Sequence, residues 1–139
     1  MTLVLDASIL VKLFHREMDS EKAIELIDHA NETDIEMMTS ELAFYEVGNA
    51  LFKHTKGTLV DGSKYLEELF RLDIDYVQIS PASATMILEC AVENGITFYD
   101  AVYFTLTDQH GAILVTEDKE LLEKCPNTSS LDDALKGSL

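Results

Sequence analysis

The sequence predicts an α/β fold in which a parallel sheet of four or five short strands lies between helices on both faces. Three short apolar runs indicate strands, and they cover residues 3–5, 74–79 and 112–116. Stretches with helical spacing of apolar residues separate these runs. Strands that alternate with helices are typical of a parallel sheet, because parallel neighbours need a crossover connection.

The first third of the chain is predicted to contain one clear strand, two helices and one weaker strand. The strand at residues 3–5 is followed by a short helix over residues 8–14. Asp19 or Ser20 can cap the next helix. Its apolar residues fall on one face, and they are Ala23, Ile24, Ile27 and Ala30. Residues 35–38 form a short apolar run that is a weaker strand candidate.

Two helices are predicted before the second clear strand. Thr39 and Ser40 would cap the first, over residues 41–53, and its buried stripe would be Ala43, Val47, Ala50 and Leu51. The Lys56-Gly57-Thr58 sequence indicates a helix stop and a restart. The next helix carries apolar or small residues on one face, namely Leu59, Gly62, Leu66, Leu69 and Phe70.

The second half of the chain has the clearest residues for starting and ending helices. After the strand at residues 74–79, Ser80 and Pro81 supply an N-cap and a first helical residue, and Gly95 ends that helix. Its stripe is Ala84, Ile87, Leu88, Ala91 and Val92. A helix over residues 97–110, a strand over 112–116 and short helices over 118–123 and 131–136 complete the chain. We expect a single domain over residues 1–139.

Net charge restricts the partners that the protein can bind. The chain has 10 basic and 26 acidic residues, which gives −16 at neutral pH. Such a total repels phosphate at long range, whereas nucleic-acid binders usually carry a basic surface. Either the partner is not nucleic acid, or divalent cations and a few local basic residues make the contact. The candidates are Lys12, Arg16, Lys53, Lys56 and Arg71.

Targeting signals are not evident in the sequence. The first residues do not show the basic and apolar pattern of a signal peptide, and no apolar run approaches the ~20 residues of a membrane span. Cys90 and Cys125 form no CxxC pair. We therefore expect a cytoplasmic protein with free thiols and no membrane association.

Four acidic residues lie where chemistry could occur. Asp6 and Asp118 follow predicted strands, so the carboxyl ends of a parallel sheet would bring them to one edge. Glu46 and Asp100 lie in otherwise apolar helical stretches, where a carboxylate is costly unless it is paired or metal-bound. Each residue also has a structural explanation, because Asp6, Asp100 and Asp118 could cap helices and Glu46 could face water. Their joint placement favours a site.

Four segments around these acids carry a family resemblance. They are residues 5–8 (LDAS), 45–51 (YEVGNAL), 98–103 (FYDAVY) and 115–118 (VTED), with Leu121 after the last. Their order and spacing resemble PIN-domain ribonucleases, in particular the VapC-like toxins of toxin–antitoxin pairs. The resemblance implies a PIN-like three-layer sandwich and a Mg²⁺ or Mn²⁺ cofactor. It also implies a single-stranded RNA substrate that is cut to 5′-phosphate and 3′-hydroxyl products.

The same resemblance assigns roles to individual residues. It implies that Asp6, Glu46, Asp100 and Asp118 are the catalytic and metal-binding quartet, and that Ser8, Asn49 and Thr116 are supporting polar residues. Glu117, an extra acid beside Asp118, departs from the pattern. Physical chemistry agrees, because hard cations prefer oxygen ligands and because clustered carboxylates without a cation repel one another. The predicted function is a metal-dependent endoribonuclease that uses metal-activated water.

The sequence leaves one alternative function open, and two partners are predicted. A PIN-like domain that only binds a partner or scaffolds an assembly would also suit the acidic composition. The resemblance implies a homodimer and a basic antitoxin that docks over the acidic groove. The helices at residues 20–31 and 59–72 support an interface, because Tyr65 and Phe70 exceed what one small core needs.

Overall fold

The computed structural model describes residues 1–14, 19–55 and 59–137, and within them it contains one parallel sheet of five strands. The strands are β1 (Thr2–Leu5), β2 (Glu36–Ser40), β3 (Asp75–Val77), β4 (Ile113–Val115) and β5 (Thr128–Ser129). Their order across the sheet is β3-β2-β1-β4-β5, and all four neighbouring pairs are parallel. The predicted α/β class and the sheet of about five strands are confirmed.

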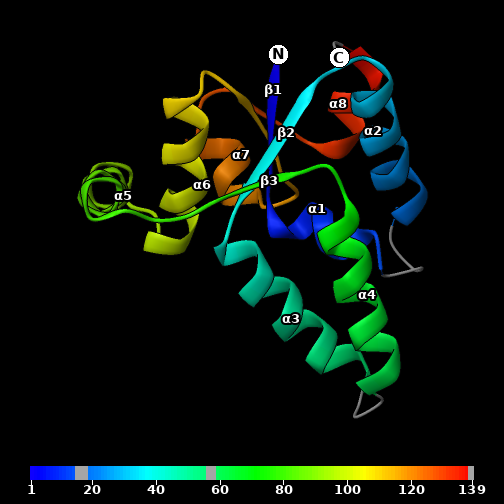
Figure 1. The fold of residues 1–139 in the computed structure, drawn as a ribbon. Helices are drawn as coiled ribbons and strands as arrows, with labels where there is room; N and C mark the ends of the chain where they lie inside the picture. The colour runs from blue at the N-terminus through cyan, green and yellow to red at the C-terminus, as the bar shows by residue number, and fades with distance from the viewer. Residues whose placement is uncertain (15–18, 56–58, 138–139) are drawn as a thin grey trace.

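Helices cover both faces of the sheet (Figure 1). They are α1 (Ala7–Lys12), α2 (Ser20–Glu32), α3 (Leu42–Thr55), α4 (Leu59–Arg71), α5 (Pro81–Asn94), α6 (Phe98–Gln109), α7 (Lys119–Lys124) and α8 (Leu131–Gly137). In Figure 1, α2 and α8 lie on one side of β1, and α6 and α7 lie on the other. The α3–α4 pair extends away from the end of the sheet at which β2 enters α3.

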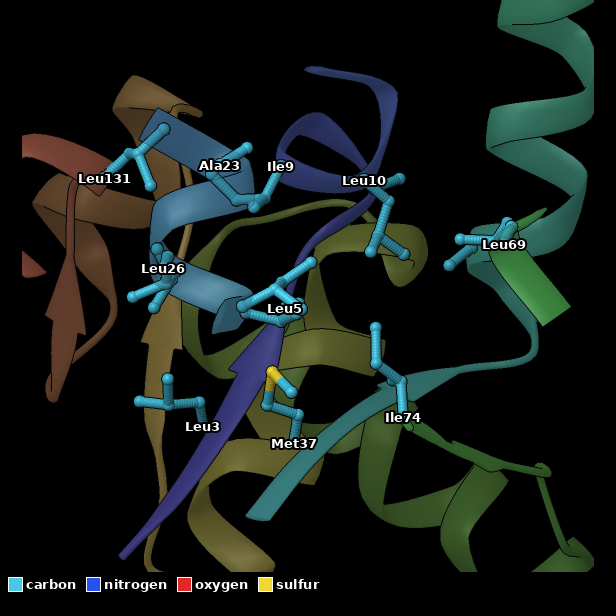
Figure 2. Close-up of a cluster of buried hydrophobic side chains, with 14 of the residues drawn as sticks. Leu3, Leu5, Ile9, Leu10, Ala23, Leu26, Met37, Leu69, Ile74 and Leu131 are labelled. Atoms are coloured by element: carbon cyan, nitrogen blue, oxygen red, sulfur yellow. The ribbon is translucent and has the colours of Figure 1, made fainter. Parts of the chain in front are cut away.

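The central strand β1 divides the core into two layers. Alternate side chains of a strand point to opposite faces, and both faces of β1 are covered. Leu3 and Leu5 therefore pack in the cluster that contains α1 and α2, and Val4 packs in the cluster that contains α6. Figure 2 shows the first cluster, in which side chains from several elements converge on Leu5. Because β1 is held on both sides, the residue that follows it has a fixed position.

The observed limits of two strands differ from the predicted ones. The weak candidate at residues 35–38 is a strand that extends to Ser40, so Thr39 and Ser40 belong to β2. Ser40 still caps, because its Oγ accepts a hydrogen bond from the Leu42 backbone N–H at 3.2 Å. The strand predicted at residues 74–79 pairs only over Asp75–Val77, and Ile79 is exposed. The two-residue β5 was not predicted, because a polar dipeptide carries no strand pattern.

The observed limits of the helices agree better with the predicted ones, because a helix cap depends on residues within one turn of it. Ser80 caps α5 in a capping box, Pro81 is its first residue, and Gly95 ends it in the left-handed conformation with φ 63°. Leu88 and Val92 of the predicted α5 stripe are exposed, however. The stop predicted at Lys56-Gly57-Thr58 lies outside the described residues, as does Arg16. None of the helices that the structure describes combines the length and the apolar character needed to cross a bilayer.

The buried face of α2 differs from the prediction by one residue. Ile24 is 46% exposed, whereas Leu26 is fully buried. Ala23, Leu26, Ile27 and Ala30 have i, i+3, i+4, i+7 spacing and face the core together. The sequence favoured Ile24 because it is apolar, but the docking angle of α2 on β1 decides which side chain is covered.

The two substitutions Leu26→Ala and Ile24→Ala test this correction. Leu26→Ala should lower the free energy of unfolding by about 2–5 kcal/mol, because it empties a filled core position. Ile24→Ala should change the same quantity by less than about 1 kcal/mol, since the side chain already contacts water. Urea denaturation of both variants gives the comparison, and an equal or reversed order would refute the placement of α2.

Candidate active site

The four acids selected from the sequence line one cavity of about 600 Å³ at the carboxyl edge of the sheet. Asp6 follows β1, Glu46 comes from α3, Asp100 from α6, and Asp118 from the turn after β4. Ser8, Lys12, His54 and Glu117 also line this cavity, together with Ala7 and Val11. Residues separated by more than 100 positions in the chain thus share one acidic cleft, because the strands β1 and β4 are neighbours.

Asp6 is the most buried of the four, with 6% of its surface exposed. It is the N-cap of α1, and its Oδ1 accepts a hydrogen bond from the Ser8 backbone N–H at 3.2 Å. Its Oδ2 accepts hydrogen bonds from the hydroxyls of Ser8, at 3.2 Å, and Thr116. The structural explanation of Asp6 is therefore confirmed, because its carboxylate caps α1, and its functional role stays a prediction that its place in the cleft supports.

Thr116 connects Asp6 to Asp118. Its Oγ1 donates to Asp6 and accepts a hydrogen bond from the Asp118 backbone N–H at 3.0 Å. Asp118 caps α7, because its Oδ1 accepts from the N–H groups of Glu120 and Leu121 at 2.9 and 3.0 Å. Thr116 is fully buried. It therefore links the Asp6 carboxylate to the Asp118 backbone from beneath the cleft.

Glu46 is oriented by a residue to which the sequence analysis gave no role. The Tyr103 hydroxyl donates a hydrogen bond to Glu46 Oε1 at 2.8 Å, although the two residues lie 57 positions apart. Tyr103 lies three residues after Asp100, on the buried face of α6. A tyrosine at a buried helical position needs a partner for its hydroxyl, and that requirement is the signal that could have identified it.

Asp100 occupies the first turn of α6. Thr97 is the N-cap, and its side-chain oxygen accepts a hydrogen bond from the Asp100 backbone N–H at 3.1 Å. The backbone of Asp100 therefore serves the cap, and its carboxylate remains on the cleft side, where it lines the cavity. A negative charge is favourable at the N-terminus of a helix.

Three of the four carboxyl groups have raised pKa values. Burial is the main cause for Asp6, whose pKa is raised despite its hydrogen bonds with Thr116 and Ser8. Burial also raises the pKa of Glu46, and the charges of Asp6 and Asp100 raise it further. The pKa of Asp100 is raised by burial and by the nearby charges of Asp118 and Asp6. Each ionised carboxylate thus disfavours ionisation of its neighbours.

The remaining predicted or unusual residues are distributed more widely. Ser8 lines the cleft, and its Oγ accepts a hydrogen bond from the Glu117 backbone N–H at 3.2 Å. Asn49 is exposed on α3 and is not among the described residues that line the cleft. Glu117 lines it, but its Oε1 accepts a hydrogen bond from the Leu131 backbone N–H at 3.0 Å, at the start of α8. That contact gives the extra acid a structural role.

The donor atoms of the cleft suit a hard divalent cation. Carboxylate and hydroxyl oxygens are the ligands that Mg²⁺ and Mn²⁺ prefer, and a cation would relieve the repulsion that raises the carboxyl pKa values. In the described part of the chain, no three His, Cys, Asp or Glu side chains are close enough together, as placed, to hold one ion. The donor chemistry therefore fits a metal, while the side chains stand further apart than ligands of a single ion.

Comparison with known proteins identifies the class to which this fold and cleft belong. The chain is a member of the PIN-domain family, since the family model for the PIN domain matches residues 3–125. Ribonuclease VapC3 from Pyrobaculum aerophilum is 35% identical over 133 residues, which cover 91% of this chain and 96% of the relative. Exonuclease VapC9 from the same organism is 34% identical over 94 residues, which cover 68% and 71%. The sequence resemblance to VapC-like proteins is confirmed.

Solved structures agree with this assignment. The crystal structure of PAE2754 from Pyrobaculum aerophilum matches with a TM-score of 0.72 at 30% identity, over 95% of this chain and 90% of that one. VapBC2 from Rickettsia felis, bound to a DNA fragment from its promoter, matches with a TM-score of 0.73 over 94% and 98%. At 15% identity the second likeness shows the fold alone.

The substitution Asp100→Asn tests whether the acids oppose folding. The pKa of Asp100 is higher in the folded protein than in the unfolded chain, where it is about 4. Asp100 therefore contributes most to the free energy of unfolding below pH ~4, where it is protonated in both states. That contribution is lost as the pH rises through the pKa of the folded state. The Tm of metal-free Asp100→Asn at pH 7–8 should therefore equal or exceed that of the wild type, and the difference should vanish near pH 4. Thermal melts across this pH range provide the measurement.

Asp132→Asn is the matched control, because Asp132 also lies in the first turn of a helix. Lys22, 2.7 Å away, lowers the pKa of Asp132. The contribution of Asp132 to the free energy of unfolding is therefore present above pH ~4, and it is lost as the pH falls through the pKa of Asp132 in the folded state. Asp132→Asn should leave the Tm at pH 7 unchanged or slightly lower, since exposed ion pairs are weak. A large loss of Tm in Asp100→Asn would instead make Asp100 a structural residue of α6.

Proposed function

We propose that this protein is a metal-dependent endoribonuclease that cleaves single-stranded RNA. The observation that carries the proposal is the gathering of Asp6, Glu46, Asp100 and Asp118 around one cleft, with raised pKa values for three of them. Perturbed carboxyl groups in a cleft are typical of a functional site. The membership of the PIN family and the name of the relative ribonuclease VapC3 support the same reaction class.

The cofactor in this proposal is Mg²⁺ or Mn²⁺, and Asp6, Glu46, Asp100 and Asp118 would hold it once their carboxylates move closer together than they stand in the described structure. When bound, such an ion supplies Lewis-acid activation of water and charge stabilisation at the phosphate. Ser8 and Thr116 would keep Asp6 in a fixed orientation through their hydrogen bonds. Because Thr116 also binds the backbone of Asp118, the two acids at the sheet edge would act as one rigid pair.

Contact with RNA must overcome the charge of −16. Lys12 lines the cleft beside the acids and supplies a local positive charge, with Asp19 3.9 Å from its ammonium group. Lys12 and the cation together would place positive charge only where the phosphodiester lies. Since the chain as a whole stays net acidic, we expect weak binding outside the cleft and a small dependence of affinity on salt.

A toxin–antitoxin role is the second part of the proposal. Solved VapBC assemblies from other organisms share the fold. A basic antitoxin segment that places Arg or Lys in the acidic cleft would form charge-assisted hydrogen bonds with the carboxylates. The same contact would compete with the metal and so inhibit cleavage. The acidic total of the chain favours a basic partner of this kind.

A binding or scaffold domain without nuclease activity is the alternative. The acidic composition favours it, because −16 opposes RNA binding. The complete set of four cleft acids opposes it, since a scaffold gains nothing from carboxylates that raise one another's pKa. Metal-dependent cleavage of a labelled RNA distinguishes the two functions directly.

The substitution Asp6→Asn tests the enzymatic proposal. It should reduce the rate of RNA cleavage by at least ~10²-fold, because it removes a charged ligand while the N-cap of α1 can persist. EDTA should abolish cleavage by the wild type, and Mg²⁺ or Mn²⁺ should restore it. A gel assay with end-labelled single-stranded RNA measures both effects. Cleavage that survives EDTA and Asp6→Asn would falsify the assignment.

Two controls sharpen this experiment. Glu117→Gln removes a charge from the same cleft but retains an oxygen for the Leu131 N–H, so its cleavage rate should stay within about 3-fold of the wild type. A circular single-stranded RNA separates endonuclease from exonuclease activity, because it has no ends. Linearisation of the circle is expected, and degradation of linear RNA alone would make the protein an exonuclease, as the relative VapC9 is named.

A homodimer is also part of the proposal. Tyr65 does not support it, because it packs against the core and against Phe14 at a ring distance of 5.2 Å. Phe70 is exposed, although it stacks on Phe44 at 4.3 Å. Further exposed apolar residues lie on α3 and α5, and they are Tyr45, Phe52, Leu88 and Val92. The proposed dimer would cover apolar side chains of this kind.

Light scattering across a concentration series tests the dimer. The expected mass is twice that of the 15.5 kDa chain at micromolar concentrations. Replacement of both Phe52 and Val92 by Ser should shift the mass toward one chain, because it removes apolar area from the proposed interface. A mass that stays near one chain at high micromolar concentration would contradict the dimer.

A further inference from the structure

Tyr103 lies in an apolar layer, yet it carries a hydroxyl group. It is 2% exposed, and its cluster includes Val4, Leu106, Leu114 and Leu121. A hydroxyl in such surroundings costs free energy unless it forms a hydrogen bond. Phenylalanine would fill the same space without that cost. The presence of tyrosine therefore calls for an explanation beyond packing.

The explanation lies at the far end of the ring. The Tyr103 hydroxyl donates a hydrogen bond to Glu46 Oε1 at 2.8 Å. The backbone N–H of Ala7 points toward the phenol oxygen of Tyr103 and favours negative charge on it. Ala7 is the first residue of α1 and follows Asp6 directly. The phenol thus joins α6, α3 and the start of α1 at one point, beneath the cleft that Asp6 and Glu46 line.

Glu46 needs such a restraint more than Asp6 and Asp118 do. Asp6 and Asp118 are short side chains that cap helices, so hydrogen bonds to the backbone fix them. Glu46 has one more rotatable bond than an aspartate, and it lies on the exposed part of α3. A free side chain of this kind pays rotamer entropy each time it adopts one orientation. A fixed donor on a buried ring removes part of that cost in advance.

We propose that Tyr103 is a positioning residue that holds the Glu46 carboxylate in the cleft, oriented toward Asp6 and Asp100. This inference rests on the proposed function of the cleft as a metal-dependent nuclease site. It assigns Tyr103 no contact with substrate, because the ring is buried. Its effect passes through the orientation of one carboxylate, in the way that hydrogen-bond partners of metal ligands tune affinity in other proteins.

Tyr103→Phe removes only the hydroxyl and keeps the ring in its layer. Cleavage of single-stranded RNA should show a kcat about 10- to 100-fold lower with little change in KM, because the substitution disturbs a partner of a ligand and no substrate contact. The concentration of Mn²⁺ needed for half-maximal rate should rise. A second readout needs no activity, since the increase in Tm on addition of Mn²⁺ should be smaller in the variant than in the wild type.

Tyr76→Phe is the matched control. Tyr76 also donates its hydroxyl, to the Leu69 carbonyl at 3.3 Å, but it is not among the described residues that line the cleft. This variant should keep the wild-type kcat and the wild-type Mn²⁺ response. A double-mutant cycle with Glu46→Gln completes the design. If Tyr103 acts through Glu46, Tyr103→Phe should have almost no additional effect in the Glu46→Gln background.

The outcomes separate this inference from the proposed function. Unchanged kcat and unchanged Mn²⁺ response in Tyr103→Phe, beside an active wild type, would overturn the positioning role alone. Equal losses in Tyr103→Phe with and without Glu46→Gln would also overturn it. If the wild type cleaves no RNA with either metal, the proposed nuclease function fails. The comparison of Tm increases with Mn²⁺ then decides the positioning role by itself.

Discussion

The burial of Asp6 at the end of the central strand is the constraint on which the site depends. Strand β1 is paired on both sides and covered on both faces, so Asp6 cannot move away from its neighbours. Its carboxylate is retained there by hydroxyl and backbone donors from Ser8 and Thr116. The fold thus maintains a carboxyl group in surroundings that oppose its ionisation, and a cation bound in the cleft, as proposed, would relieve this cost.

The other acids are held around Asp6 by different means. Asp118 and Asp100 lie at helix starts, where backbone N–H groups and helix dipoles favour negative charge. Glu46 comes from the exposed part of α3 and depends on the buried hydroxyl of Tyr103. Because the net charge of the chain is −16, the proposed selectivity for RNA would have to come from the cleft itself. The same net charge makes a basic protein partner favourable.

Particular residues show why the fold was largely predictable. Ser80, Pro81 and Gly95 act within a few residues of themselves, so the limits of α5 followed from local backbone chemistry. The strands β1 and β4 were visible because apolar runs buried on both faces have few alternatives. Ile24 and Leu88 were assigned to buried faces on the basis of their apolar character, but a helix on a small sheet cannot bury its whole apolar surface.

The sequence by itself determined the order of most elements and so predicted the sheet edge that joins Asp6 to Asp118, because residue type, local caps and the period of apolar residues act over short distances. It predicted the set of four acids through motifs that resemble the PIN family. Only the tertiary structure decided that Thr116 lies beneath the cleft, that Glu117 caps α8 and that Asn49 stays exposed on α3. It alone paired Tyr103 with Glu46. Such contacts join residues distant in the chain, and their geometry depends on how α3 and α6 pack against the sheet.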